Sequence, residues 1–275
     1  MRYNFHTHSH LDDGKDTLEN YVKSAIEKGV VALGFSAHAP VENGSNWCLP
    51  EDKLQEYCNE VRLLKEKYKG KADVYLGLEM DYIPGISEGF SRLYEKCGLE
   101  YNIGSVHLVK NKTSGRLWFI DGPEKGYKEG IEKTFNGDIK SAIGTFYEQS
   151  CAMIAKEKPN IIGHLDKVKM HNKERYFSER EKWYVEMTDK LINVIADSNA
   201  IVELNTRGKY TGKTDEFFPS VDILKKCYMK KIPVMVNTDA HDPSQVNMLF
   251  DEATTLLKDI GFKEMQTPFF KVKLC

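Results

Sequence analysis

The sequence lacks any long apolar run. The longest, around Val30–Phe35, is far shorter than the roughly 20 residues that span a bilayer. The first ten residues, MRYNFHTHSH, also lack the apolar core of a signal peptide and instead carry three histidines. We therefore expect no membrane association and a cytoplasmic location.

Closely spaced cysteine pairs are also missing. The six cysteines are scattered along the chain, with no CxxC motif among Cys48, Cys58, Cys97, Cys151, Cys227 and Cys275. This pattern predicts reduced thiols, and it argues against a disulfide framework or a cysteine-based zinc site.

An excess of charge of one sign is the third absence. The 39 Lys and Arg residues nearly balance the 41 Asp and Glu residues, for a formal net charge of −2. Such a chain has no overall field to attract long nucleic acid, although a local basic pocket is compatible with it. The hydrophobic fraction of 41% is enough for a sizeable core.

Short apolar segments alternate with longer amphipathic ones. The short segments, rich in Val, Ile, Leu and Tyr, predict strands at 3–6, 32–36, 74–78, 101–105, 161–163, 201–204 and 234–237. The longer ones predict helices at 18–28, 50–69, 139–157, 178–198, 220–230 and 244–260. This alternation predicts parallel strands with helices outside, and about seven units in 275 residues favour a barrel. Residues 108–138 are irregular and glycine-rich, so we expect a long loop over the active face.

The histidines are placed where a barrel gathers its functional groups. His6 and His8 are two residues apart, so on a strand they point to the same face. Four others each follow a different predicted strand, namely His38, His107, His164 and His241. Acidic residues occupy similar positions, namely Asp13, Glu79 and Asp239. Because the carboxyl ends of barrel strands meet at one face, we expect these side chains to lie together.

Nine imidazoles and carboxylates are too many for one ion. A zinc ion takes three or four protein ligands, so this set suits two or three ions that share a bridging carboxylate. Imidazole and carboxylate ligands suit Zn²⁺, Mn²⁺ or Fe. Clustered ions of this kind cleave phosphate esters, because they activate water and stabilise the charge that develops on the phosphoryl group.

At these positions the chain resembles the polymerase and histidinol phosphatase (PHP) family of metal-dependent phosphoesterases. The matching motifs, in order along essentially the whole chain, are His6-x-His8, Asp13-Gly14, Ser36-Ala37-His38, Gly77-Leu78-Glu79, Ser105-Val106-His107, Gly163-His164 and Asp239-Ala240-His241. The chain looks most like the histidinol-phosphate phosphatase branch, through Gly77–Tyr82, Gly104–His107, Ile161–Lys167, Leu204–Gly208 and Asn237–His241.

The resemblance implies an α/β fold, a distorted (β/α)7 TIM-like barrel of the PHP type that forms one domain over residues 1–275. It also implies three divalent ions. His6, His8 and Asp239 would hold the first and His107 and His164 the second, with Glu79 bridging the two, and Asp13, His38 and His241 would hold the third. Asp12 could compete with Asp13, because the family often has Ser-Asp-Gly where this chain has Asp12-Asp13-Gly14.

The implied reaction is hydrolysis of L-histidinol phosphate to L-histidinol and phosphate, a step of histidine biosynthesis, by attack of a metal-bridging hydroxide. The predicted catalytic residues are Glu79, Asp239 and Asp166, the last as a general acid or as a contact of the substrate amine. Arg207 is the first candidate for binding phosphate, because a guanidinium donates two parallel hydrogen bonds. Lys167 and Arg116 are weaker candidates, and a salt-bridge or surface role is the alternative for each of these residues.

Three other functions are compatible with the sequence. The nearest is a sister phosphoesterase that acts on another small phosphate monoester or a nucleotide. The second is a metal-dependent amidohydrolase, which would usually have fewer ligands and a metal-bridging lysine, and no lysine lies at a strand end among the ligands here. The third is a non-catalytic metal-binding module, against which the complete ligand set argues.

Overall fold

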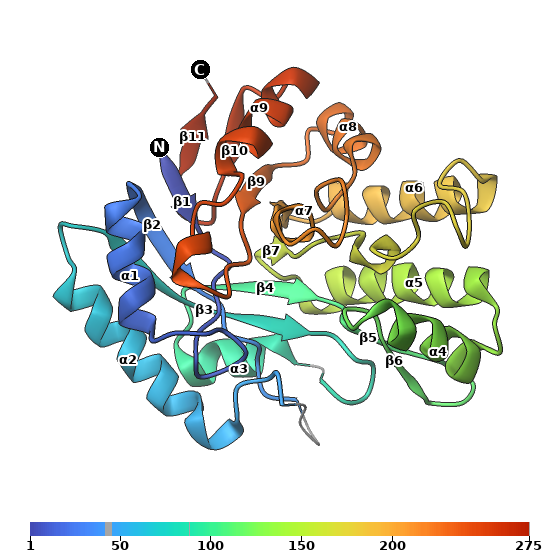
Figure 1. Cartoon of the computed structure of the whole chain (residues 1–275), viewed down its shortest axis with the longest axis horizontal. Coiled ribbons are helices and arrows are strands. Elements are labelled where there is room, and N and C mark those ends of the chain that lie inside the picture. The colour runs from blue at the N-terminus through green and yellow to red at the C-terminus, as the bar shows by residue number, and fades with distance from the viewer. Residues whose placement is uncertain (42–45, 88, 275) are drawn as a thin grey trace.

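The computed structural model describes residues 1–41, 46–87 and 89–274, and it contains a central sheet of seven strands (Figure 1). In their order across the sheet, the strands are β1 (Arg2–Asn4), β2 (Val30–Phe35), β3 (Asp73–Asp81), β4 (Tyr101–Ser105), β7 (Ile161–Ile162), β8 (Ile201–Asn205) and β9 (Val234–Asn237). Neighbouring strands are all parallel. The outer strands approach each other beyond their ends, where Thr7 and Ala240 form a parallel bridge. The sheet is therefore a nearly closed barrel, and the predicted (β/α)7 architecture is confirmed.

Helices surround the barrel (Figure 1). They are α1 (Leu18–Glu27), α2 (Leu54–Lys67), α3 (Phe90–Cys97), α5 (Ile139–Glu157), α6 (Lys182–Ala196), α7 (Arg207–Tyr210), α8 (Val221–Met229) and α9 (Phe250–Ile260), with short 3-10 turns at Glu51–Lys53, Lys167–Lys169 and Pro243–Gln245. Asp138 caps α5 because its side chain accepts a hydrogen bond from the Ser141 backbone amide. The helix predicted from residue 178 begins only at Lys182, since Ser178 and Glu181 close a turn before it.

One tyrosine fills the barrel interior between neighbouring strands. The Tyr101 hydroxyl donates to the carbonyls of Phe5 and Phe35, at 2.7 and 2.9 Å. Its ring lies against Gly34 and Gly77, where an added Cβ atom would come within 2.4 and 2.5 Å of the tyrosine side chain. Small residues on β2 and β3 therefore make room for a large one on β4, a packing that binds three strands together.

The expectation of a long loop at residues 108–138 is wrong. This region forms an antiparallel hairpin of β5 (Leu108–Lys110) and β6 (Leu117–Phe119), followed by α4 (Glu124–Phe135). Trp118 of the hairpin packs where Gly130 of α4 leaves room, since an added Cβ atom there would lie 2.1 Å from the indole. One of the glycines that predicted a loop, Gly130, instead permits close packing of a helix.

A second hairpin, β10 (Glu264–Gln266) and β11 (Lys271–Lys273), lies near the C-terminal end of the chain.

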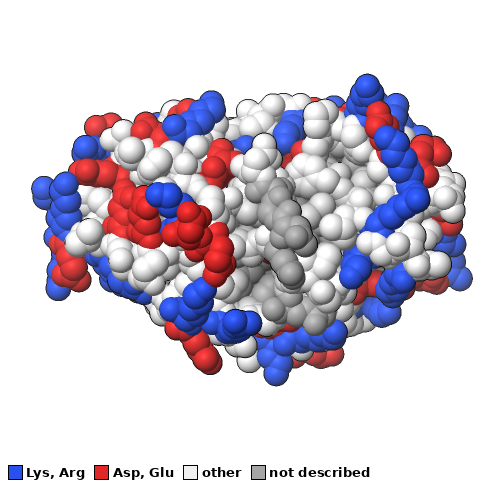
Figure 2. Space-filling model, turned by 90° about the horizontal axis from the view of Figure 1, so that it is seen from below, with Lys and Arg blue, Asp and Glu red and all other residues white. Residues whose placement is uncertain are grey.

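The described cysteines remain reduced, as their spacing predicts. None of the five cysteines in the described part forms a disulfide bond, and Cys275 lies outside the described residues. In the same part of the chain, each helix is too short or too polar to cross a membrane. Figure 2 shows acidic side chains gathered on the left of the face in view, and basic side chains around its edge and on its right.

Candidate metal centre

The nine predicted ligand residues lie at the carboxyl ends of six barrel strands. His6, His8 and Asp13 follow β1, His38 follows β2, Glu79 belongs to β3, His107 follows β4, His164 follows β7, and Asp239 and His241 follow β9. All are buried except Asp13. His164 and Asp239 have positive φ angles of 23° and 52°. Such strain in non-glycine residues costs about 1–3 kcal/mol each and is common at functional sites.

Four buried side-chain atoms of the kind that bind metals form a ring, and none of the four has a hydrogen-bond partner. They are Nε2 of His6, Oδ1 of Asp239, Nε2 of His8 and Oε2 of Glu79. Around this ring, successive atoms are separated by 3.7, 3.3, 3.6 and 3.2 Å. Neighbouring ligand atoms around one zinc ion lie about 3.4 Å apart, close to these separations. Because buried polar atoms are normally hydrogen-bonded, the ring fits a cation held between these side chains.

The second carboxylate oxygen of Glu79 faces another pair of histidines. Oε1 lies 2.9 Å from Nε2 of His164 and 3.7 Å from Nε2 of His107. It also accepts a hydrogen bond of 2.6 Å from the Ser105 hydroxyl. Each oxygen of Glu79 therefore borders a different set of ligand nitrogens, as a carboxylate shared by two ions requires.

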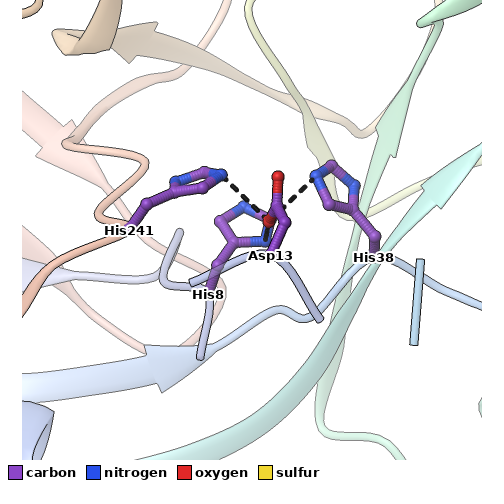
Figure 3. A group of neighbouring side chains, drawn as sticks. All are labelled: His8, Asp13, His38 and His241. Carbon is purple, nitrogen blue, oxygen red and sulfur yellow. Dashed lines mark ion pairs between the residues drawn. The ribbon is translucent and has the colours of Figure 1, made fainter. Parts of the chain in front are cut away.

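A third group gathers around Asp13 (Figure 3). Its Oδ1 atom lies 3.1 Å from Nε2 of His241, 3.8 Å from Nε2 of His38 and 3.6 Å from Nδ1 of His8. His38 also approaches Glu79, with 3.0 Å between Nδ1 and Oε2. The Asp13 group is thus continuous with the ring rather than a separate site.

Two further carboxylates orient these histidines without joining the cluster. Asp12 accepts from Nδ1 of His8 at 2.6 Å and from the backbone amide of His38 at 3.1 Å, so Nε2 of His8 is left to face the ring. This arrangement favours Asp13 over Asp12 as the ligand candidate. Glu203 of β8 does the same for Nδ1 of His6, at 2.6 Å. The sequence reasoning missed Glu203, although a charged residue within a buried strand was the available signal.

The charges of the cluster favour a cation. Burial would raise the pKa of Glu79, but His6, His38 and His107 hold that pKa well below its usual value. Burial would lower the pKa of His8, but Asp12 and Asp239 raise it to about 10, so these carboxylates favour a positive charge at this position. Glu79 is therefore held in its ionised state, the form in which carboxylates bind metals. Imidazole nitrogens with carboxylate oxygens suit zinc, manganese or iron.

A family model described as "PHP domain" matches residues 3–207. The chain belongs to the PHP domain family. A relative from Deinococcus radiodurans, named a probable histidinol-phosphatase, is 26% identical over 89% of this chain and 88% of its own length.

Two solved structures share the fold of this PHP protein. A putative histidinol phosphatase from Listeria monocytogenes matches with a TM-score of 0.82 and 20% identity, over 91% of this chain and 99% of the other. Histidinol phosphate phosphatase from Lactococcus lactis, solved with zinc, L-histidinol and phosphate, matches with a TM-score of 0.67 and 21% identity over 99% of both chains.

Two of the predicted substrate contacts border the cluster of this PHP protein. Nη1 of Arg207 donates to the Asp239 carbonyl at 3.0 Å. Nζ of Lys167 lies 3.4 Å from Nε2 of His107 and 2.7 Å from Oδ2 of Asp121. A small pocket is lined in part by Arg207, Lys167, Lys213, Asp121 and Asp239. The sequence reasoning missed Asp121, which lies in the region interpreted as a loop.

The two other predicted residues contact different parts of the molecule. Oδ2 of Asp166 accepts from the Ser220 backbone amide at 2.9 Å and lies 3.4 Å from Nζ of Lys169. Burial raises the pKa of this carboxyl, even though Lys169 opposes the shift. Arg116 is exposed near the turn of the β5–β6 hairpin, and its guanidinium donates to the Lys133 carbonyl at 2.7 Å. Neither side chain has a contact with the cluster among the interactions of the described residues.

Proposed function

We propose that this protein is a metal-dependent phosphatase that hydrolyses L-histidinol phosphate to L-histidinol and phosphate. The observation that carries the proposal is the ring of four buried donor atoms without hydrogen bonds, with Arg207 and Lys167 beside it. The names of the relatives support the substrate, since the Deinococcus protein is a probable histidinol-phosphatase and the Lactococcus structure contains L-histidinol and phosphate.

The cluster would hold three divalent ions, and zinc is the first candidate because the Lactococcus structure contains it. His6, His8 and Asp239 would hold one ion and His107 and His164 another, with Glu79 between them, while Asp13, His38 and His241 would hold the third. When bound, such ions supply Lewis-acid activation of water and of the phosphoryl group.

The cationic side chains would bind the phosphate. Arg207 is fixed by its hydrogen bond to the Asp239 carbonyl, and its guanidinium can donate to two phosphoryl oxygens. Asp121 holds Lys167 and Lys213, with ion pairs of 2.7 and 3.0 Å. This arrangement places a fixed positive charge beside His107. Asp166 and Arg116 lie outside the proposed site, because their contacts are with Ser220, Lys169 and Lys133.

The test is a substrate panel with the metal-loaded protein. Phosphate release is measured from L-histidinol phosphate, adenosine monophosphate and glucose 6-phosphate under the same conditions. We expect histidinol phosphate to be hydrolysed by far the fastest, and the Glu79→Gln variant to show that no contaminating phosphatase contributes. Equal rates across the panel would remove the histidinol phosphate assignment and leave a PHP phosphoesterase of another specificity.

A further inference from the structure

One aromatic side chain, Trp47, lies against two candidate ligands, and a second, Phe119, packs on Trp47. The centroid of Trp47 lies 4.7 Å from the ring of His38, at an interplanar angle of 85°, and 5.6 Å from the ring of His107. Phe119, the last residue of β6, stacks on Trp47 with centroids 5.8 Å apart and an angle of 22°. We call Trp47 and Phe119 the aromatic pair. Through Trp47 the pair borders His107, and Lys167 contacts the same histidine.

Backbone hydrogen bonds next to both members tie them to the ligands. The amide of Leu49, two residues after Trp47, donates to the carbonyl of His38 at 2.9 Å. The amide of Ile120, which follows Phe119, donates to the carbonyl of His107 at 3.0 Å. The position of the aromatic pair is therefore coupled to the positions of two metal-ligand candidates, as a preorganised binding surface requires.

The aromatic pair is also unusually exposed for its size. Phe119 is 37% exposed and Trp47 is partly buried, whereas Trp118, the neighbour of Phe119 on β6, is 1% exposed. Trp118 points into the space beside α4, so the alternation of the strand turns Phe119 to the opposite face. An apolar surface that remains open beside a polar cluster is available to a ligand.

We infer that Trp47 and Phe119 bind the ring of the leaving group and make the enzyme select phosphate monoesters whose alcohol carries a planar ring. The inference rests on the proposed phosphatase function and adds the part of the site that reads the organic half of the substrate. A flat ring stacks on or meets the edge of aromatic side chains, and a protonated imidazole also gains from the faces of their π-systems. Arg207 and Lys167 would hold the phosphate while the aromatic pair holds the ring.

The experiment compares two esters that differ only in the ring. L-Histidinol phosphate and 2-aminopropyl phosphate share the phosphate and the amine, and only the first has an imidazole. We expect Trp47→Ala to lower the ratio of kcat/KM for the ringed ester over the ring-free ester about tenfold, mainly through the KM of the ringed ester. Trp47→Phe, which keeps a ring, should restore most of the ratio.

Leu117→Ala is the matched control, because Leu117 is 40% exposed and lies two residues before Phe119 on the same strand. It should leave the ratio as in the wild type, and metal content per chain should be the same in all variants. An unchanged ratio in Trp47→Ala, or equal losses on both esters, would overturn the inference.

Failure of the proposed function gives a different result. In that case the wild-type protein prefers another ester in the substrate panel, and the ratio is measured with 2-phenylethyl phosphate against ethyl phosphate, whose leaving alcohols are similarly basic. A wild-type protein that does not prefer the ringed member of either pair contradicts the role of the aromatic pair, whatever its natural substrate is.

Discussion

Glu79 is the residue on which the candidate metal centre depends most. Its Oε2 atom lies 3.2 Å from Nε2 of His6 and 3.0 Å from Nδ1 of His38, and its Oε1 atom lies 2.9 Å from Nε2 of His164. These three histidines follow three different strands, β1, β2 and β7. One buried carboxylate therefore offsets the partial charges of groups that the chain brings together from distant positions.

Replacing Glu79 should separate metal binding from folding. Glu79→Gln keeps the shape of the side chain and removes its charge, so we expect at least about a 100-fold loss of phosphatase activity and fewer bound ions per chain. Circular dichroism should still show the folded protein. Glu186→Gln changes an exposed side chain of α6 and is the control, so it should retain both phosphatase activity and bound metal. Wild-type activity in Glu79→Gln would contradict the bridging role.

Asp12 and Asp13 are adjacent in the sequence but are expected to act differently. Asp12→Asn removes the carboxylate that accepts from Nδ1 of His8, so metal affinity should fall about 10–100-fold while the number of sites is kept. Asp13→Asn should instead reduce the number of ions bound, because Asp13 forms a candidate metal site with His38 and His241. Titration of the metal-free variants with zinc measures both quantities. Equal behaviour of the two variants would contradict this division.

Most of the ligand residues could be predicted because they lie at or soon after the end of a short apolar segment, which marks the end of a strand, whereas Asp13 was indicated by its spacing from His8. The residues that support them could not. Glu203 and Asp121 act through neighbours on other elements, namely His6 and Lys167, and no periodicity within their own segments indicates those contacts. Trp47 is similar, since its contact with His107 depends on how two loops meet.

At the scale of elements, the sequence predicted the seven barrel strands and six of the helices, and it missed α3, α4 and the strands of the two hairpins. For α4 the cause can be named. Glycine is the reason, because Gly126 and Gly130 both weaken the helical pattern. Their environments differ, however. An added Cβ atom at Gly126 meets nothing within 4 Å, whereas at Gly130 it would overlap Trp118. One glycine of α4 is required by packing and the other is not.

The same substitution should therefore have opposite effects at these two positions. Gly126→Ala should raise the free energy of unfolding by about 0.5 kcal/mol, because alanine loses less backbone entropy in a helix. Gly130→Ala should lower it by about 1–3 kcal/mol, because the indole of Trp118 must move. Urea denaturation measures both changes, and the two variants serve as controls for each other. Changes of the same sign would contradict the packing of the hairpin against α4.

At the scale of the whole molecule, the barrel is closed by asparagine side chains and by the isolated backbone bridge of Thr7 and Ala240, rather than by a regular ladder of strands. The amide of Phe5 donates to Oδ1 of Asn237, and the amide of Thr238 donates to Oδ1 of Asn4, each at 2.8 Å. We call these contacts between the ends of β1 and β9 the seam. The alternation of strands and helices predicted a barrel, but it contains no information on the seam. The seam matters for function because His6 and Asp239 follow it directly on its two sides.

Metal binding should consequently stabilise the entire barrel. The candidate ligands extend from His6 to His241 in the sequence, and only the closed barrel brings them together, so ions bind the folded chain far better than the unfolded one. An ion at 100 times its Kd adds about 2.7 kcal/mol, and for a chain of this length each kcal/mol shifts Tm by about 2–4 °C. Removal of metal with a chelator should lower Tm by about 5–10 °C, and added zinc should restore it. Glu79→Gln, which has lost the shared ligand, should respond much less. If the metal-free and metal-loaded proteins, checked by elemental analysis, have the same Tm, the cluster is not coupled to closure of the barrel.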